Sequence, residues 1–242
     1  MNIDRHYITV SDIPVEIVRK DIKNLHLGVY PPEGSVRLSV PRHITDDNVR
    51  LAVVTRLSWI KKRQQEFKNQ PRQSERQYIT GESHYFRGKR YILEVVGRRG
   101  RHEVEIKNNA RIRMYVNPGT TEQNRALALE NWYRNQLKNE VAFLLEKWLP
   151  IVDKPLTFWG VKRMKTKWGS CNISSKRIWI NSELAKKSPE CLEYILVHEL
   201  VHLYERKHNE NFKRLMDGYL PQWRRCRDTL KSEPLAYEEW TY

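Results

Sequence analysis

The residues best suited to chemistry lie in the segment Val197-His198-Glu199-Leu200-Val201-His202, which contains the pattern H-E-x-x-H. On an α-helix, residues four apart share one face, so His198 and His202 can bind one metal ion. Glu199 lies beside them on the same helix, where its carboxylate can accept a proton from a water that the metal activates. Two imidazoles and one carboxylate at this spacing predict the core of a zinc hydrolase.

A third ligand is available at His208, which extends the pattern to H-E-x-x-H-x5-H. The motif helix is predicted to begin at Ser188-Pro189, because Ser is a good N-cap and Pro suits the first helical position. Asn209 is a good N-cap for a second helix. His208 is therefore expected at the turn between two helices, where it can fold back toward the first. Without the upstream motif, a solvated loop histidine would be the better interpretation.

The elements that must position this motif alternate irregularly between strands and helices. Alternating or β-branched segments predict strands in the first half of the chain at 7–10, 15–18, 27–30, 36–40, 85–86, 91–96, 103–106 and 112–116. Apolar spacing predicts helices from Thr45 to about Phe67 and over about 121–148, with Pro150 and Pro155 marking the end of the second.

Two more strands, near 156–159 and 177–180, are expected before the motif helix. Mixed elements without strict alternation predict the α+β class. Residues 71–75 have the composition of a polar linker, and no internal repeat is apparent. We expect two regions, a β-rich and helical N-terminal region over 1–150 and a metal-binding region over 151–242.

The overall composition is that of a globular protein. The chain has 242 residues, of which 39% are hydrophobic, and it contains no apolar run long enough to predict a membrane span. Its start lacks the pattern of a secretion signal. Three cysteines, Cys171, Cys191 and Cys226, are an odd number without C-x-x-C spacing, which favours reduced thiols and a cytoplasmic protein.

The net charge of +15 predicts attraction to anions, such as nucleotides, phosphates or nucleic acid. The charge is densest over residues 98–101 and 162–167. A solubilising surface would account for the charge equally well. We find no helix-turn-helix, zinc-finger or RNP-type pattern, so sequence-specific nucleic-acid binding is not indicated.

Several motifs of the last third together resemble one known family. They are Lys167-Trp168-Gly169-Ser170-Cys171, Trp179-Ile180-Asn181-Ser182-Glu183-Leu184, the H-E-x-x-H segment, His208, Phe212 and Pro221. The chain resembles the YgjP-like family of metal-dependent hydrolases, which is related to the SprT-type and other zincin metallopeptidases. Phe86-Arg87-Gly88-Lys89-Arg90 and Trp59-Ile60 agree, so the resemblance covers nearly the whole chain.

The resemblance implies a C-terminal zincin-like catalytic unit. His198, His202 and His208 would be the zinc ligands, Glu199 the catalytic residue, and residues 168–171 a strand near the site. Many relatives carry Arg where this chain has Lys167, which keeps the charge but loses the bidentate fork.

The expected reaction is hydrolysis by a water that Zn²⁺ activates and Glu199 deprotonates. A second electrophile should stabilise the transition-state oxyanion, and the candidates are Arg163, Lys165, Lys167 and Tyr204.

The sequence leaves three functions open. The first is peptide hydrolysis, which the zincin resemblance favours. The second is hydrolysis of a phosphoanhydride in a nucleoside triphosphate, which the basic segments would favour. The third is a nucleic-acid-binding or partner-binding protein with a structural zinc, for which Glu210 and Asp217 are the nearest candidates for a fourth ligand.

Overall fold

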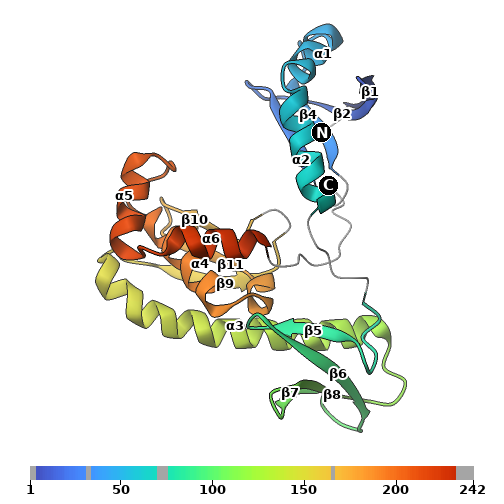
Figure 1. Ribbon diagram of the computed structural model, residues 1–242, viewed down its shortest axis with the longest axis vertical. Coiled ribbons are helices and arrows are strands. Elements are labelled where there is room, and N and C mark those ends of the chain that lie inside the picture. Colours follow the sequence, from blue (N-terminus) through green and yellow to red (C-terminus); the bar gives the residue numbers. More distant parts are fainter. Residues whose placement is uncertain (1–3, 31–33, 70–75, 165–166, 233–242) are drawn as a thin grey trace. The chain divides into compact units, whose positions relative to one another are not determined.

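The computed structural model describes residues 4–30, 34–69, 76–164 and 167–232, and it has the α+β architecture predicted from the sequence (Figure 1). The chain forms two compact units that meet in sequence at residues 74 and 75. This boundary falls inside the predicted linker, which itself lies outside the described residues. The division predicted near residue 150 does not coincide with it, because a long helix that crosses this point packs on elements from both sides.

The first unit is a four-stranded sheet followed by two helices. Its elements are β1 (Asp4–Val10), β2 (Ile13–Lys20), β3 (His26–Tyr30), β4 (Ser35–Pro41), α1 (Asp46–Val54) and α2 (Leu57–Asn69). The strand order is β1-β2-β4-β3, with β2 and β4 parallel and the outer pairs antiparallel. Ile17, Leu38 and Ile60 are fully buried between sheet and helices.

The single helix predicted from Thr45 to Phe67 is therefore two helices. The break lies at Thr55, whose backbone N–H donates to Leu51 and whose hydroxyl donates to the carbonyl of Ala52 at 3.1 Å. The β-branched side chains of Val53, Val54 and Thr55 lower the helix propensity of this stretch, which favours an interruption here.

The second unit begins with a sheet of the same design. Its strands are β5 (Ser83–Phe86), β6 (Lys89–Gly97), β7 (Glu103–Lys107) and β8 (Arg111–Val116), in the order β5-β6-β8-β7. Here too the central pair is parallel and the outer pairs are antiparallel. The first hairpin of each sheet turns through two residues with positive φ, Ser11-Asp12 and Arg87-Gly88, as a two-residue type I′ turn requires.

The two sheets also share an ion pair at equivalent positions. Glu16 lies opposite Arg37 on the parallel pair β2–β4, and the guanidinium donates to the carboxylate at 2.6 Å. Glu94 and Arg113 are paired in the same way on β6–β8, at 3.0 Å. The same cross-strand pair thus joins the two central strands of each sheet.

The helices that follow the sheets begin with the same cap. Thr45 accepts a hydrogen bond from the backbone N–H of Asn48, and Thr121 accepts one from that of Asn124. We call each sheet with its following helix a ββββα module. The chain contains two copies, although the sequence shows no repeat, because the copies share strand pairing and a few side-chain contacts rather than a run of identical residues.

The helix of the second module, α3 (Glu122–Val152), lies along both its own sheet and the remaining elements of the unit (Figure 1). It ends at Val152, between the two prolines that were predicted to mark its end, and so extends a few residues beyond the predicted residue 148. Its C-cap residue is Asp153, which has φ of 50° and donates its backbone N–H to Leu149 at 3.0 Å. Burial of Trp148 and Val152 stabilises this last turn despite the proline.

The rest of the second unit carries the H-E-x-x-H motif. It comprises β9 (Phe158–Lys162), β10 (Gly169–Asn172), β11 (Arg177–Asn181), the 3₁₀ turn η1 (Ser182–Lys186), α4 (Pro189–Val201), α5 (Glu210–Tyr219) and α6 (Trp223–Ser232). The sheet order is β10-β11-β9, so β10 is an edge strand. The strand predicted at 156–159 lies slightly later, as β9.

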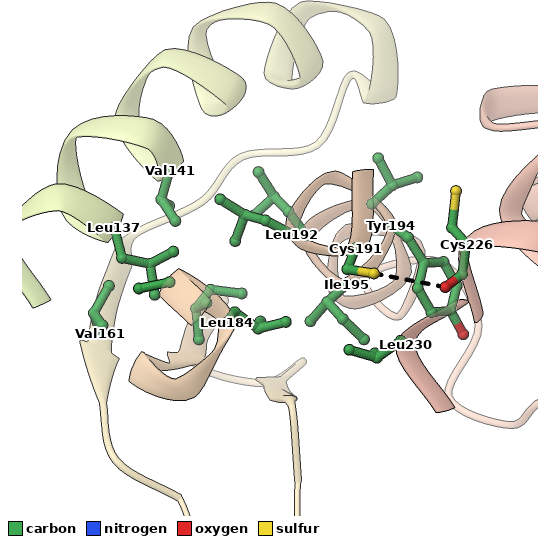
Figure 2. Packing of buried hydrophobic residues seen from close by; sticks show 14 of the residues in the cluster. Leu137, Val141, Val161, Leu184, Cys191, Leu192, Tyr194, Ile195, Cys226 and Leu230 are labelled. Atoms are coloured by element: carbon green, nitrogen blue, oxygen red, sulfur yellow. Dashed lines mark hydrogen bonds between the residues drawn. The ribbon is translucent and has the colours of Figure 1, made fainter. Parts of the chain in front are cut away.

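Helix α4 is buried on almost every side. Figure 2 shows Leu192 facing Leu137 and Val141 of α3, while Cys191 lies near α6 and directs its thiol toward the carbonyl of Cys226 at 3.8 Å. A helix that is apolar nearly all round is typical of a protein core. This packing gives the motif a rigid base. No helix among the described residues is long and apolar enough to cross a membrane.

Candidate metal centre

Three imidazoles converge at the end of α4. His198 lies on the last turn of the helix, His202 is its C-cap residue, and His208 precedes the N-cap of α5. One ring nitrogen of each lies within 4.8 Å of those of the other two, and the Nε2 atoms of His198 and His208 are 3.0 Å apart. The predicted fold-back of His208 therefore occurs, and no straight helix could have produced it.

The ring of Phe212 packs against the imidazole rings of all three histidines. Its ring centroid lies 4.8–4.9 Å from the centroids of all three imidazoles, and its side chain is buried. Asn209 caps α5 by accepting the backbone N–H of Phe212 at 3.0 Å. The cap that the sequence predicted thus fixes both the start of α5 and the residue that packs under the histidines.

The protonation states of the histidines suit a metal. His202 directs Nδ1 to the carbonyl of Glu205 at 2.9 Å, which leaves Nε2 without a proton and available as a ligand. Burial lowers the pKa of His202, and burial with the two neighbouring imidazoles lowers the pKa of His198 to about 3. Neutral imidazoles at neutral pH are the form that binds Zn²⁺, so this donor set fits the metal.

Glu199 lies beside the cluster and is 5% exposed. Burial raises the pKa of its carboxyl to about 8, and the charge of Lys167 partly opposes this shift. The side chain packs against the backbone of β10 at Gly169, where a Cβ would lie 2.5 Å from Oε1 of Glu199. Glycine is required at this position because the carboxylate occupies the space of a side chain.

A cavity of about 740 Å³ opens onto these groups. Its walls are residues 167–174, which include β10, and the face of α4 that carries Tyr194, His198 and Glu199. Two cations, Lys167 and Arg206, also line it. Of residues 168–171, which the resemblance placed on a strand near the site, Gly169 to Cys171 lie on β10 and Trp168 directly precedes it.

Asn181 holds one wall of the cavity in position. Its amide donates to the carbonyls of Met164 and Lys167 at 2.8 Å each, and its backbone N–H donates to Trp168 at 2.9 Å. Its side-chain oxygen also accepts the backbone N–H of Glu183 at 3.2 Å. One buried amide thus connects β11 to the segment that leads into β10.

The four candidate electrophiles differ in whether they line the cavity. Lys167 lines the cavity, whereas Arg163 forms an ion pair with Glu130 and does not line it. Tyr204 also lies outside the lining and donates its hydroxyl to the carbonyl of Val152. Lys165 lies outside the described residues.

The two candidates for a fourth ligand are engaged elsewhere. Glu210 is 88% exposed in its side chain and is paired with Lys213. Asp217 accepts hydrogen bonds from Trp223 at 2.8 Å and from Arg224. Within the described ranges, the three histidines are the one group of side chains that could hold a metal ion.

Some residues of the site were not predicted from the sequence. Tyr194 lies four positions before His198, so helical spacing alone could have placed it on the same face. Arg206 follows the motif in the turn, but its direction depends on how the turn folds. Asn181 belongs to a motif that the resemblance included, but its bonds to Met164 and Lys167 were not predictable because these residues lie on another segment.

Cys171 lines the cavity but is not chemically activated. Burial and the nearby Glu199 raise the pKa of its thiol to about 11. A thiol of this kind is protonated at neutral pH, and a reactive cysteine needs the opposite shift.

Three imidazoles and a buried carboxylate at an open cavity of an α+β fold are the features of a metal-dependent hydrolase. The chain belongs to the YgjP-like metallopeptidase domain family, whose model matches residues 23–233. The family confirms the resemblance seen in the sequence and establishes the class as metallopeptidase-like.

Two solved structures, both archaeal metallopeptidase zymogens, are similar over part of the chain. Abylysin of Pyrococcus abyssi is 22% identical, with 37% of this chain and 90% of that chain covered and a TM-score of 0.35. Jannalysin of Methanocaldococcus jannaschii is 25% identical; the match covers 39% of this chain and 89% of jannalysin, with a TM-score of 0.31. No curated protein matches the chain.

Proposed function

We propose that the protein is a zinc-dependent peptidase in which Glu199 is the general base. The observation that carries this proposal is the convergence of three imidazole nitrogens within 4.8 Å at an open cavity that Glu199 also lines. Family membership supports the reaction class. The identity of the metal, the role of Glu199 and the bond that is cut are our inferences.

His198, His202 and His208 would hold the metal. When bound, Zn²⁺ supplies a Lewis acid that lowers the pKa of a water at its open position toward 7. The hydrogen bond from His202 to the carbonyl of Glu205 orients the imidazole of His202. The ring of Phe212 packs against all three imidazoles and limits their movement. These contacts hold the imidazoles in position before any metal arrives.

Glu199 accepts the proton of the attacking water and passes it to the leaving group. In the metal-free protein, burial raises the pKa of this carboxyl to about 8, so it is mostly protonated at neutral pH. The positive charge of a bound Zn²⁺ would favour the ionised carboxylate, which is the form that acts as a base. Close packing on Gly169 leaves the carboxylate little freedom to move. Lys167 is the cation best situated to attract the developing negative charge of the substrate, since it lines the cavity and Arg163 does not.

The edge strand β10 favours a peptide as substrate. It forms one wall of the cavity and pairs with β11, and no other strand among the described residues pairs with its second edge. An extended peptide can bind such an edge through main-chain hydrogen bonds. This wall would align a peptide bond with Glu199.

A phosphoanhydride is the second candidate substrate. Lys167 and Arg206 both line the cavity, and two cations beside a metal would suit a nucleoside triphosphate. A purely structural zinc has less support, because the three histidines face an open cavity and neither Glu210 nor Asp217 is directed toward them.

A substrate screen of the zinc-loaded protein tests this proposal. Fluorogenic peptide libraries and nucleoside triphosphates are offered in parallel, with Glu199→Gln as the control for contaminating activity. We expect peptide cleavage that falls by at least about 10²-fold in Glu199→Gln while the zinc content stays at one per chain. Cleavage of triphosphates alone would replace the peptide with the second candidate.

Metal analysis tests the ligands separately. His208→Ala should weaken zinc binding by orders of magnitude, because it removes one of three protein ligands. Unchanged zinc affinity in this variant would remove His208 from the site. Undiminished hydrolysis by Glu199→Gln on any substrate would mean that the general base lies elsewhere.

A further inference from the structure

Each ββββα module has a cavity beside an outer strand of its sheet: between β3 and the start of α2 in the first module, and between β7 and α3 in the second. In the first module the cavity measures about 450 Å³ and is lined by Leu25, His26, Leu27, Arg56 and Trp59. In the second it measures about 620 Å³, and its walls include Arg101, His102, Val104, Asn131, Trp132 and Asn135. Neither cavity shares a residue with the metal centre.

The two cavities occupy equivalent positions relative to their sheets. Leu27 of β3 pairs with the middle of β4, and Val104 of β7 pairs with the corresponding residue of β8. On the helical side, the first cavity is lined by Arg56, at the break between α1 and α2, and by Trp59 of α2, whereas the second is lined by residues of the unbroken α3. A cavity beside this outer strand therefore occurs in both modules.

Both cavities combine the same three chemical groups. Each is lined by one indole, one guanidinium and one imidazole, although these come from different positions in the two copies. No Asp or Glu lines either cavity. Trp59 is 42% exposed, so its ring is accessible from solvent, whereas Trp132 is half-buried and packs against Phe86 and Tyr133 while still lining its cavity.

The polar side chains of these walls have no partner within the described part of the chain. In the first module, this holds for His26 and Arg56. In the second, it holds for Arg101, His102 and the amide of Asn131. Nearby, Arg98 is by contrast paired with Glu103 at 2.6 Å. Several unpaired donors beside an indole indicate a surface suited to an external ligand.

We propose that each module binds single-stranded nucleic acid at this cavity. An unpaired base presents a π-face that can stack on the indole, and the guanidinium can contact the adjacent phosphate. The amides of Asn131 and Asn135 can contact the edge of an exposed base. An acidic peptide would engage the cations but leave the indole and the amides without a role. The net charge of +15 favours any polyanion at long range.

Fluorescence anisotropy with a labelled oligodeoxythymidylate of about 20 nucleotides tests this proposal on the full chain. Arg56→Glu combined with Arg101→Glu reverses one cation in each cavity. The matched control is Lys61→Glu combined with Arg90→Glu, which changes the net charge equally. Lys61 lies about 160° from Trp59 around α2, and Arg90 lies on β6, outside the cavity walls. The cavity pair should weaken binding by about tenfold or more, and the control pair by no more than about threefold.

A neutral variant separates stacking from charge. Trp59→Leu should weaken binding about fivefold without changing the slope of log Kd against log salt, since it removes a ring and no charge. Circular dichroism verifies that each variant is folded.

Competition on the unchanged protein needs no variant. The unlabelled single strand should displace the probe at far lower concentration than a duplex of the same length or polyglutamate. Three results would overturn the proposal: equal effects of the cavity and control pairs, displacement by duplex as efficient as by single strand, or displacement by polyglutamate at the same concentration. The last would identify an acidic polypeptide as the ligand. None of these measurements depends on hydrolysis, so their outcome is independent of the peptidase proposal.

Discussion

Replacing Gly169 with alanine adds one methyl group at the point where β10 packs against Glu199. The new Cβ would lie 2.5 Å from Oε1 and 2.7 Å from Cγ of that side chain. Ordinary contact begins at 3.4 Å, so the carboxylate must move by about 0.9 Å (3.4 − 2.5) or β10 must shift by a similar amount. A displacement of about 1 Å at a reacting group can cost roughly 10²-fold in rate.

We therefore expect kcat/KM of Gly169→Ala on the peptide substrate to fall by about 10²-fold. The zinc content should stay at that of the unchanged protein, because the three histidines lie on α4 and the following turn and not on β10. Gly218→Ala is the matched control: it makes the same substitution in α5, where no atom lies within 4 Å of the added Cβ, and should retain full activity.

A double variant decides whether Gly169 acts through Glu199. If it does, adding Gly169→Ala to Glu199→Gln should reduce the residual activity no further, because effects on one functional unit are not additive. Full activity in Gly169→Ala would refute the reasoning, as would a loss of activity accompanied by a loss of zinc. Thermal unfolding of each variant distinguishes a local displacement from general destabilisation.

Three further outcomes follow from the same contacts. In the metal-free protein, burial raises the pKa of Glu199 from 4.5 to about 8, so the folded state favours the neutral carboxyl. The contribution of this group to the free energy of unfolding is therefore full below pH 4.5 and is lost as the pH rises through 8. The lowered pKa values of His198 and His202 act in the opposite sense over the lower part of this range. The test is therefore the difference in unfolding free energy between the metal-free protein and its Glu199→Gln variant, measured in urea, which should decline by an amount on the order of a few kcal/mol from pH 4.5 to pH 8. Phe212→Ala should lower the free energy of unfolding by about 3–5 kcal/mol and also weaken zinc binding, as urea titration and metal competition would show. Cys171 should react slowly with iodoacetamide at neutral pH in the folded protein because its thiol pKa is raised to about 11, and rapid labelling, measured by mass spectrometry, would contradict this.

The boundaries of the motif helices were predictable because caps are local. Helix α4 begins at Pro189 as predicted, although the Ser188 side chain makes no cap hydrogen bond and donates to the Cys191 thiol instead; Asn209 caps α5 as its residue type indicates. The same local rule correctly identified Thr45 as the cap of α1. With both helix ends known, the turn that carries His208 followed directly.

Other features depend on partners far away in the sequence and could not be read from it. The last turn of α3 continues past Pro150 because Trp148 and Val152 are buried against other elements. The role of Asn181 arises from its bonds to another segment. Arg163 belongs to a basic run beside the site, but its ion pair with Glu130 directs it elsewhere. Charge density along the chain was thus a poor guide to which cations face the cavity.

If the three histidines bind a metal as we propose, the position of His208 would make that metal a cross-link between two helices. His198 and His202 belong to α4, whereas His208 lies just before α5, so one ion would close the short loop between the two helices. The three cysteines are free, and closure of a loop by metal bonds limits the unfolded chain much as a disulfide would. The apparent stability of α5 against α4 should consequently vary with the free zinc concentration, since a ligand that binds only the folded state stabilises it by mass action. Zinc supply would then control both how fast this protein works and how long it persists.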